Sequence, residues 1–463
     1  MLSAVSRKVR LSSLARSKSA AQDVDLPEED GEAFADAAEA HLHPDAHDEG
    51  GLACTNLELL EAQRGAIVEV IKSLGKNLLA GNLDLLKVSL PVRMFEPRSY
   101  LQKLADPWVY PRFLRLAAEA ADPVERLKWV VTYFIAGFHH AFERWAKPFN
   151  PVLGETWQAG LSDGSRIFLE QISHHPPISA FQLAGPDGLY TFTGLSQPSV
   201  SYGTNAVKTT AKGYRVLDFA DGGRIEMHFP TYYLRGLLYT SAPRGELTGT
   251  AEFTDAQNGL SVEVRFGRLE EARRSVGGGG AGRDGTVLAR SDAFSGTLFR
   301  SLSPATVAPA AAAAAGSPPA GELDRADSCS SAGSGWQMPA SAMAERSKRS
   351  SSSWSTLKSL GSLSLGLRSK SSPAVAEAEA PRVAIERCTG NWLSHLDWEQ
   401  QRYWTLLEER HEEWQPEEQP LPSDCRYRQD LALLAAGDVK AAQAAKEALE
   451  QRQRQDAKLR GIH

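Results

Sequence analysis

The apolar positions of the chain first take up a helical period near residue 57. Four apolar side chains recur on one face of this stretch, Leu60, Ile67, Ile71 and Leu74, with Ala66 and Val70 alongside. A period of 3.6 residues predicts an amphipathic helix with one buried side. Thr55 and Glu58 have the spacing of a capping box at its start, and Gly75 ends it. Such a helix at the edge of a domain usually packs on the core.

Helical periods return between residues 99 and 142, and the dipeptides Asp106-Pro107 and Asp122-Pro123 interrupt them. Because proline cannot continue a helix from within, these dipeptides predict helix boundaries. From Glu155 to Phe266 the period changes to two, as in residues 190–193 and 262–266. Turn signals recur along this stretch: Asp163-Gly164, Pro186-Asp187-Gly188, Asp221-Gly222-Gly223 and Gln257-Asn258-Gly259. Short strands with regular turns predict an antiparallel barrel or sandwich, and a large, imperfectly closed barrel leaves an apolar interior wide enough for a ligand.

The composition changes after Leu269. Residues 277–280 are a glycine tract, residues 291–299 predict one more strand, and residues 301–381 are rich in alanine, proline and serine, which predicts disorder. Within this insertion, five apolar side chains fall at helical spacing between basic ends: Trp354, Leu357, Leu360, Leu363 and Leu367. Two interpretations stay open, a phosphorylatable serine-rich linker and a membrane-contact helix that folds at a lipid surface.

Folded sequence resumes at about Cys388 and ends in a predicted helix from Asp438 to Leu459. Lys446, Glu450 and Arg454 lie at i, i+4 and i+8 of this helix, so they share one face. On their own, such residues describe an exposed face with weak ion pairs.

Charge and cysteine content narrow the class of protein. The formal net charge is −6, which argues against a general nucleic-acid binder. The four cysteines form no CxxC pair and indicate a reducing compartment. No apolar run reaches the roughly 18 residues of a membrane-spanning helix, which predicts a soluble or peripheral protein. We also expect a monomer. Residues 1–20 are rich in serine and basic residues, as in a transit peptide or a disordered arm.

Two short motifs carry candidate chemistry. Residues 170–177 read Glu-Gln-Ile-Ser-His-His-Pro-Pro, in which His174 and His175 follow an apolar run and precede two prolines. Because proline disfavours the α region for the residue before it, this motif predicts a strand that runs into an extended stop. Residues 147–155 read Lys-Pro-Phe-Asn-Pro-Val-Leu-Gly-Glu, so Lys147 and Asn150 lie three residues apart on a proline-stiffened loop. A stiff loop presents polar groups to an oxygen-rich headgroup at little entropic cost.

Both motifs resemble the fingerprints of the oxysterol-binding protein family, and residues 421–430 are similar to a third family stretch, departing from it at Cys425 and Gln429. The resemblance covers most of residues 57–270 and 385–460. It implies an α+β, mostly β fold: a near-complete antiparallel β-barrel enclosing a lipid tunnel, with an N-terminal helical lid and C-terminal helices. The lid residues would be Ile67, Val70, Ile71 and Leu74.

The resemblance also implies the ligands. They are phosphatidylinositol 4-phosphate and, in exchange for it, a sterol or phosphatidylserine, with no cofactor. The implied headgroup-binding residues are Lys147, Asn150, His174, His175, Lys446, Glu450 and Arg454. No segment of the pleckstrin-homology or ankyrin type precedes the domain, so the resemblance is to the short class of the family.

An acidic tract near the N-terminus points to a protein partner. Phe34 follows acidic residues and is itself followed by Asp36 and Glu39, which resembles the phenylalanine motif that binds VAMP-associated proteins of the endoplasmic reticulum. Ala33 and Ala35 depart from that motif, and a disordered acidic linker is the alternative. Together these segments predict a disordered arm over residues 1–50, a lipid-binding domain over 51–300, an insertion over 301–384 and the rest of the domain over 385–463. The expected location is the cytosol and, peripherally, membranes at endoplasmic reticulum contact sites.

Enzyme activity is not expected. The sequence contains neither a GxSxG elbow nor an HExxH motif. Adjacent histidines are expected to project divergently without a third ligand, so a zinc site at His174 and His175 is not predicted. A scaffold at membrane contacts without net lipid transfer, and less plausibly a phosphoinositide hydrolase, are the alternatives to a carrier.

Overall fold

The computed structural model describes residues 41–74, 90–202, 205–237, 243–267, 290–302 and 381–461. The motif around Phe34, Asp36 and Glu39 and the segment with Trp354, Leu357 and Leu360 lie outside the described residues. Residues Leu42–His463 form one compact unit.

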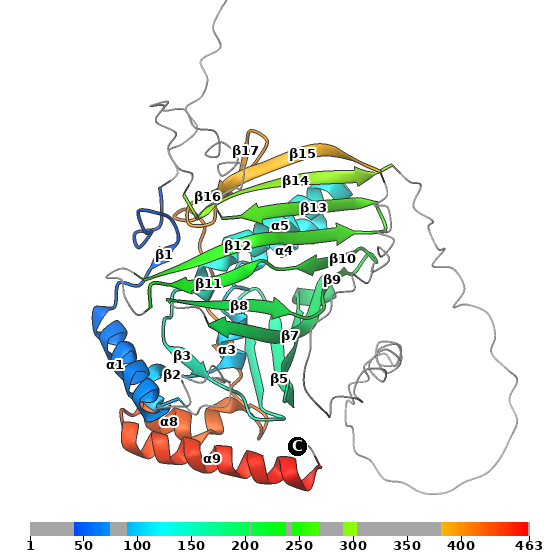
Figure 1. Cartoon of the computed structure of the whole chain (residues 1–463). Helices are drawn as coiled ribbons and strands as arrows, with labels where there is room; N and C mark the ends of the chain where they lie inside the picture. Colours follow the sequence, from blue (N-terminus) through cyan, green and yellow to red (C-terminus); the bar gives the residue numbers. More distant parts are fainter. Residues whose placement is uncertain are drawn as a thin grey trace, which may run out of the picture. The chain divides into compact units, whose positions relative to one another are not determined.

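One large antiparallel sheet dominates this unit, as the sequence predicts (Figure 1). Its main path runs in the order β17 (Gln401–Thr405), β16 (His395–Trp398), β15 (Arg382–Asn391), β14 (Ala293–Ser301), β13 (Leu260–Phe266), β12 (Arg244–Asp255), β10 (Arg224–His228), β9 (Arg215–Phe219), β7 (Tyr190–Tyr202), β6 (Pro177–Ala184), β5 (Arg166–His174), β4 (Thr156–Gly160) and β18 (Gln415–Pro416). Most neighbours in this order are also neighbours in sequence, because each predicted turn joins two adjacent strands. The turns at residues 163–164, 186–188, 221–223 and 257–259 are confirmed.

The two longest central strands divide between two sets of neighbours. The first half of β7 pairs with β9, while its second half pairs with β8 (Ala206–Lys212). Likewise β12 pairs with β10 at one end and with β11 (Thr231–Arg235) and β1 (Leu52–Ala53) at the other. Since β8 also pairs with β11, two routes of hydrogen-bonded strands lead from β7 to β12.

Helices pack against the sheet to form the core. They are α3 (Tyr100–Ala105), α4 (Pro111–Glu119) and α5 (Pro123–Gly137), followed by the 3-10 helix η3 (Phe138–Ala141). The boundaries at Asp106-Pro107 and Asp122-Pro123 are confirmed, and the Asp122 side chain caps α5 by accepting from the amide of Val124 (3.1 Å). Phe134 of α5 is buried against Phe192 of β7 and Phe253 of β12, with ring centroids 5.2 and 5.9 Å away. Figure 1 shows α4 and α5 behind strands β12–β14.

Two sequence predictions need correction at element boundaries. Helix α1 (Leu57–Leu74) forms as expected, but Asn56 caps it: its side-chain oxygen accepts from the amide of Leu59 (2.9 Å). The capping box on Thr55 is therefore wrong, because the helix begins one residue later than that motif requires. Strand β15 begins at Arg382, ahead of the expected boundary at residue 385.

The insertion leaves and re-enters the sheet at one place. Ser301 at the end of β14 pairs with Arg382 at the start of β15. One step further, the amide of Leu302 donates to the carbonyl of Pro381 (2.7 Å). Residues 303–380 thus begin and end on adjacent strands.

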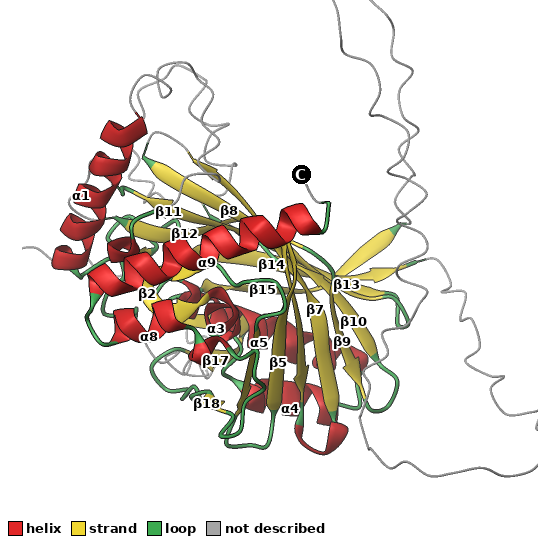
Figure 2. Cartoon of the chain, turned by 90° about the horizontal axis from the view of Figure 1, so that it is seen from below, coloured by secondary structure: helices red, strands yellow, loops and turns green. Residues whose placement is uncertain are grey.

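The last part of the chain forms three helices: the 3-10 helix η5 (Cys425–Tyr427), α8 (Gln429–Ala435) and α9 (Val439–Leu459). Earlier in the chain, β2 (Phe95–Ser99) and β3 (Lys147–Phe149) form a small parallel pair. The 3-10 helices η2 (Val92–Met94) and η4 (Pro186–Gly188) complete the unit. Viewed from below, α9 runs across the molecule in front of the strands (Figure 2). Among the described residues, no helix is both long and apolar enough to cross a membrane.

Candidate functional site

The two sequence fingerprints are joined by backbone hydrogen bonds. Gly154 donates to the carbonyl of Gln171 (2.8 Å), and Gln171 donates to the carbonyl of Glu155 (2.9 Å). Gly154 has φ of +78°, a region that favours glycine, so the loop at residues 147–155 depends on it for its turn. The lysine–asparagine loop therefore lies beside the strand that leads to the histidines.

The histidine motif forms a tight hairpin, so the expected extended stop is wrong. Strand β5 ends at His174, β6 begins at Pro177, and these two residues pair across the turn. The peptide between His175 and Pro176 is cis, whereas the expectation assumed an ordinary extended chain before proline. The hydroxyl of Ser173 donates to the carbonyl of Pro176 (2.7 Å) and closes the turn.

The two imidazoles contact each other and do not diverge. Their ring centroids are 4.6 Å apart in an edge-to-face arrangement. Burial lowers the pKa of His174, and the neighbouring His175 lowers it further. At neutral pH His174 therefore offers a neutral N–H donor to a ligand.

Helix α9 brings its polar face to the histidine hairpin. Asp438 caps the helix by accepting from the amide of Ala441 (2.9 Å). Gln453 reaches the Nε2 atom of His174 at 3.3 Å. The helix thus crosses the end of β5, a position that the sequence alone could not assign.

The three predicted residues of α9 lie in a row along one face of the helix, as their spacing predicts. Lys446 is buried, and its ammonium lies 2.5 Å from Glu450. Arg454 lies 3.9 Å from the second oxygen of Glu450, and its side chain is 65% exposed. Glu450 is therefore placed between a buried cation and a solvent-facing one.

Lys147 and Lys446 share one aromatic ring. Their ammonium groups lie 4.6 and 5.5 Å from the ring centre of Phe95. Lys147 also donates to the side-chain oxygen of Asn150 (2.7 Å). Burial and, next, the charge of Lys446 lower the pKa of Lys147 to about 8. Two cations held this close are stabilised by an anion, so this arrangement suits a phosphate.

Arg428 is a site residue that the sequence reasoning missed. Its guanidinium is buried between two carboxylates, 2.8 Å from Glu155 and 2.7 Å from Asp430. It also donates to the carbonyl of Asn150 (2.9 Å) and so fixes the loop that carries Lys147. Burial alone would lower the pKa of Arg428, but Asp430 and Glu155 raise it. The sequence did contain its carboxylate partners, Asp430 two residues away and Glu155 at the end of the lysine–asparagine loop. Nothing local indicated that Arg428 and Glu155 would meet.

Helix α1 is anchored by its first two turns. Gln63 donates to the carbonyl of Trp145 (3.0 Å), and Arg64 donates to the carbonyls of Gly236 (3.3 Å) and Leu237 (2.8 Å). The predicted lid residues Ile67, Val70, Ile71 and Leu74 follow within the same helix. Through Gln63, α1 is thus attached to the segment just before β3, the strand that carries Lys147.

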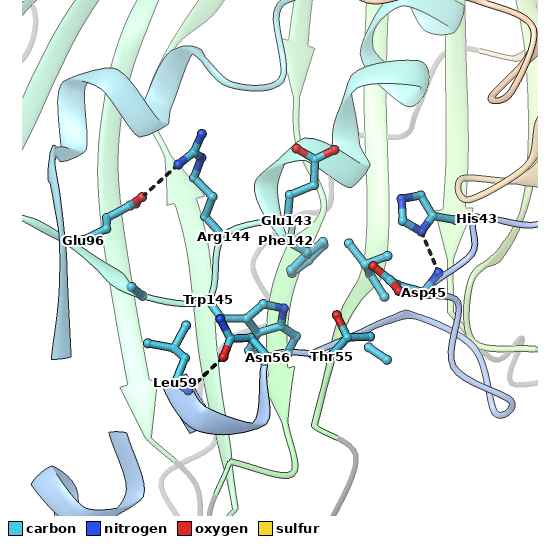
Figure 3. Close-up of a pocket in the computed structure, with 13 residues that line it drawn as sticks. His43, Asp45, Thr55, Asn56, Leu59, Glu96, Phe142, Glu143, Arg144 and Trp145 are labelled. Carbon is cyan, nitrogen blue, oxygen red and sulfur yellow. Dashed lines mark hydrogen bonds and ion pairs between the residues drawn. The ribbon is translucent and has the colours of Figure 1, made fainter. Parts of the chain in front are cut away.

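A cavity of about 400 Å³ lies at the start of α1 (Figure 3). Thr55, Asn56 and Leu59 line it from the helix side. Glu143 and His43 line it from the opposite elements. Its lining mixes apolar side chains such as Leu52, Leu59 and Phe142 with polar ones.

A further buried cation, Arg215, lies between α3 and the sheet. Arg215 of β9 is 2% exposed, packs on the ring of Phe229 (4.6 Å) and makes no ion pair with a described carboxylate. Its hydrogen bonds are long ones, to the carbonyls of Ala211 (3.3 Å) and Gly213 (3.5 Å). Nearby, the hydroxyls of Tyr100 and Ser196 are 3.0 Å apart. Buried charges are normally paired, so this group marks a place for a polar ligand atom.

The chain is similar in sequence to proteins of a known family. A family model described as oxysterol-binding protein matches residues 73–285 and 392–463 of the chain. Oxysterol-binding protein 9 of Dictyostelium discoideum is 39% identical over 221 residues, which are 48% of this chain and 51% of that protein. Oxysterol-binding protein-related protein 8 of Homo sapiens is 34% identical over 223 residues, 45% of this chain and 25% of that protein. The matches thus span about half of the first relative and a quarter of the second.

Solved structures share the fold at lower identity. The Osh1 ORD domain in complex with ergosterol has a TM-score of 0.51 and 18% identity, covering 82% of this chain and 78% of that one. The Osh3 ORD in complex with PI(4)P, from Saccharomyces cerevisiae, has a TM-score of 0.51 and 19% identity, covering 91% and 88%. The predicted fold class, a mostly β domain built on a large antiparallel sheet with accompanying helices, is confirmed.

Proposed function

The chain belongs to the oxysterol-binding protein family, and from this premise we propose that it binds and transfers lipids, extracting phosphatidylinositol 4-phosphate and exchanging it for a second lipid. The observation that carries this proposal is the group of donors around one end of the sheet. Lys147 and Lys446 share the ring of Phe95, and His174 lies beside Gln453 of α9. Together with Asn150, His175, Glu450 and Arg454 they would hold a phosphorylated headgroup through charge-assisted hydrogen bonds. The related Osh3 structure is described as a complex with PI(4)P, which supports the same ligand here.

The histidine hairpin provides the direct test. We expect the double variant His174→Ala and His175→Ala to extract phosphatidylinositol 4-phosphate from liposomes at least about fivefold less well, since it loses two donors worth about 0.5–1.5 kcal/mol each. His228→Ala is the matched control, because His228 is exposed on β10. Circular dichroism would establish that the double variant is folded. Extraction equal to that of the control would contradict the proposed role.

The second lipid is a sterol or phosphatidylserine, and Arg215 favours a sterol. A buried guanidinium beside acyl chains stays unsatisfied, whereas a hydroxyl or its bridging water gives it an acceptor. Mass spectrometry of lipids that copurify with the protein would identify the second ligand. We expect Arg215→Met to lower the sterol content and leave phosphatidylinositol 4-phosphate bound; recovery of phosphatidylserine alone from the parent would exclude the sterol.

The location belongs to the same proposal. We place the protein in the cytosol and, peripherally, on membranes at endoplasmic reticulum contacts, with Phe34, Asp36 and Glu39 binding a VAMP-associated protein. An aromatic ring among carboxylates suits an apolar pocket rimmed by basic residues. In a pull-down with the receptor's cytosolic domain, Phe34→Ala should lose binding. This substitution leaves the folded domain, including Phe95, unchanged. Equal binding of the variant and the parent would leave this tract as a linker.

A scaffold without net transfer and a phosphoinositide hydrolase are the competing functions. A carrier returns its lipid chemically intact, whereas a hydrolase releases a product. Thin-layer chromatography of radiolabelled phosphatidylinositol 4-phosphate after transfer distinguishes these two. Transfer between liposomes by the isolated protein distinguishes a carrier from a scaffold.

A further inference from the structure

A second group of histidines lies outside the two sequence motifs that form the headgroup site. His139 and His140 of η3 are both buried, 3% and 5% exposed, and Glu143 follows them at the surface. The Oε1 atom of Glu143 is 2.8 Å from Nδ1 of His140 and 3.6 Å from Nε2 of His139. One nitrogen from each histidine and one carboxylate oxygen lie within 4.8 Å of one another.

Two further histidines surround this trio from distant parts of the chain. The ring of His411, in the segment before β18, is 4.8 Å from the ring of His140. The ring of His43, in the segment before β1, is 6.2 Å from that of His139. Four imidazoles and a carboxylate thus meet where three chain segments come together.

The hydrogen bonding of the buried pair is incomplete. The Nε2 atom of His140 is buried and has no hydrogen-bond partner in the described part of the chain. Leaving such a group unsatisfied costs about 1–3 kcal/mol. The other ring nitrogen, Nδ1, faces Glu143 and is the one that an ion between these side chains would contact. Packing alone does not explain why two histidines occupy this position.

We propose that His139, His140 and Glu143 form a binding site for a divalent transition-metal ion of the zinc class. Two histidines and a carboxylate are an established donor set for zinc. With bonds of about 2.0–2.1 Å in a tetrahedron, ligand atoms lie about 3.3 Å apart. The spacings in the trio bracket this value, so side-chain shifts of about 1 Å would complete the site.

The fourth position falls to His411 or to water. His411 is exposed and its ring already contacts that of His140, so it can turn toward the ion. His43 suits this role less well, because its Nδ1 atom accepts from the amide of Asp45 (3.0 Å), which leaves the proton on Nε2. The cavity of about 400 Å³, which Glu143 lines, gives water and the ion access from the side of α1 (Figure 3).

A metal ion here would fasten separate segments of the fold. Ligands from η3 and from the segment before β18 are more than 250 residues apart, so a shared ion would close a long loop. Closing such a loop stabilises the folded state in the same sense as a crosslink. This site is independent of the proposed lipid-binding function.

The test uses the full-length protein, stripped of metal with a chelator and titrated first with Co²⁺ and then with Zn²⁺. We expect one equivalent of Co²⁺ to give the visible absorption of a tetrahedral site and Zn²⁺ to displace it. Glu143→Gln should weaken binding by more than about tenfold, because it removes a charged ligand. Glu143 is 41% exposed, so this variant is expected to fold. His140→Gln, which keeps a similar volume, should have the same effect.

Matched controls separate this site from the rest of the histidines. His228→Gln, and the pair His174→Gln with His175→Gln, should bind Co²⁺ as the parent does. Zn²⁺ should raise the unfolding temperature of the parent and these controls but not that of Glu143→Gln. Parent-like binding by both Glu143→Gln and His140→Gln, or loss of binding in the His174 and His175 pair alone, would overturn the proposal.

Discussion

At the scale of single residues, the charge of Lys147 decides how the headgroup site responds to pH. Burial and Lys446 lower its pKa from 10.5 to about 8 in the folded protein. Between these two pH values the folded state has lost a proton that the unfolded chain still binds, so the free energy of unfolding rises with pH across this window. A bound phosphate favours the charged ammonium, so binding is tightest below pH 8.

We therefore expect extraction of phosphatidylinositol 4-phosphate to weaken by up to about tenfold per pH unit as the pH rises above 8. Lys147→Met should extract less at pH 7 and should flatten this pH profile. Lys458→Met is the control, because Lys458 is exposed near the end of α9, the helix that carries Lys446. Sedimentation of protein with liposomes at pH 7 and 9.5 measures both effects. A profile in Lys147→Met as steep as in the parent would assign the titration to another group.

Two arginines of the site should separate stability from binding. Arg428 is buried between Glu155 and Asp430, whereas Arg454 is 65% exposed beside Glu450. Removing one partner of a buried ion pair costs about 3–5 kcal/mol, and an exposed pair contributes about 0–1 kcal/mol. We expect Arg428→Met to lower the free energy of unfolding by several kcal/mol, and Arg454→Met to leave it nearly unchanged but to reduce lipid extraction.

Denaturant unfolding monitored by tryptophan fluorescence compares the two variants under identical conditions. Arg428→Lys is an informative third variant, since a lysine cannot reach both carboxylates with a planar fork. An unfolding curve of Arg428→Met that coincides with that of Arg454→Met would mean that the buried pair contributes no net stability.

The difference between these arginines also shows what the sequence could and could not predict. The i, i+4 and i+8 spacing, visible in the sequence, placed Arg454 on one face of α9 with Lys446 and Glu450, and the resemblance to the family implied its role in headgroup binding. Arg428 was missed because its partner Glu155 is 273 positions away, and only the closed fold brings them together. The cis peptide before Pro176 was missed for a related reason, since local rules describe the commoner geometry.

At the scale of elements, periodicity predicted the type of each helix and strand better than it predicted where each one begins. Strands β5–β7 and β12–β14 and helices α4, α5 and α9 follow from alternation, turn residues and proline positions. The cap of α1 was placed on Thr55 instead of Asn56, because two adjacent polar residues offer nearly equal caps. The association of α9 with the histidine hairpin depends on packing between distant elements and had no local signal.

Helix α1 carries the prediction that belongs to this scale. Its first half is fixed by Gln63 and Arg64, while Ile67, Val70, Ile71 and Leu74 follow in the half expected to act as the lid. We expect Ile67→Asp with Ile71→Asp to release bound lipid at least about tenfold faster, because each carboxylate removes apolar contact worth about 1.5–3 kcal/mol. Glu58→Gln, exposed in the first turn, is the control.

Exchange of a fluorescent lipid analogue between liposomes measures this release, and hydrogen exchange locates it. Lipid binding should protect the amides of residues 67–74 in the parent, and this protection should disappear in the double variant. Release at the control rate, together with unchanged protection, would mean that α1 serves only as packing for the core.

At the scale of the whole molecule, the sheet and the insertion are separable. Residues 303–380 leave β14 and return to β15 at paired positions, with Leu302 hydrogen-bonded to Pro381. A two-residue Asn-Gly turn can therefore replace the insertion without changing the register, because type I′ turns fit the twist of paired strands. We expect this variant to unfold at the same temperature as the parent within a few degrees and to extract phosphatidylinositol 4-phosphate equally well.

The same deletion tests what the insertion does. Five apolar side chains from Trp354 to Leu367 could stabilise a membrane-bound helix by about 1.5–3 kcal/mol each if fully buried. Ordering the segment costs roughly 1–2 kcal/mol per residue in backbone entropy, and its serines and glycines make a helix harder to form. The balance is small, so binding should need loosely packed, anionic lipid, to which the flanking arginines and lysines are attracted.

We expect a peptide of residues 345–371 to be unstructured in buffer and helical on small anionic vesicles. The deletion variant should then bind such vesicles more weakly while it still transfers lipid. A circular dichroism spectrum that stays coil-like at saturating lipid would identify the segment as a phosphorylatable tether.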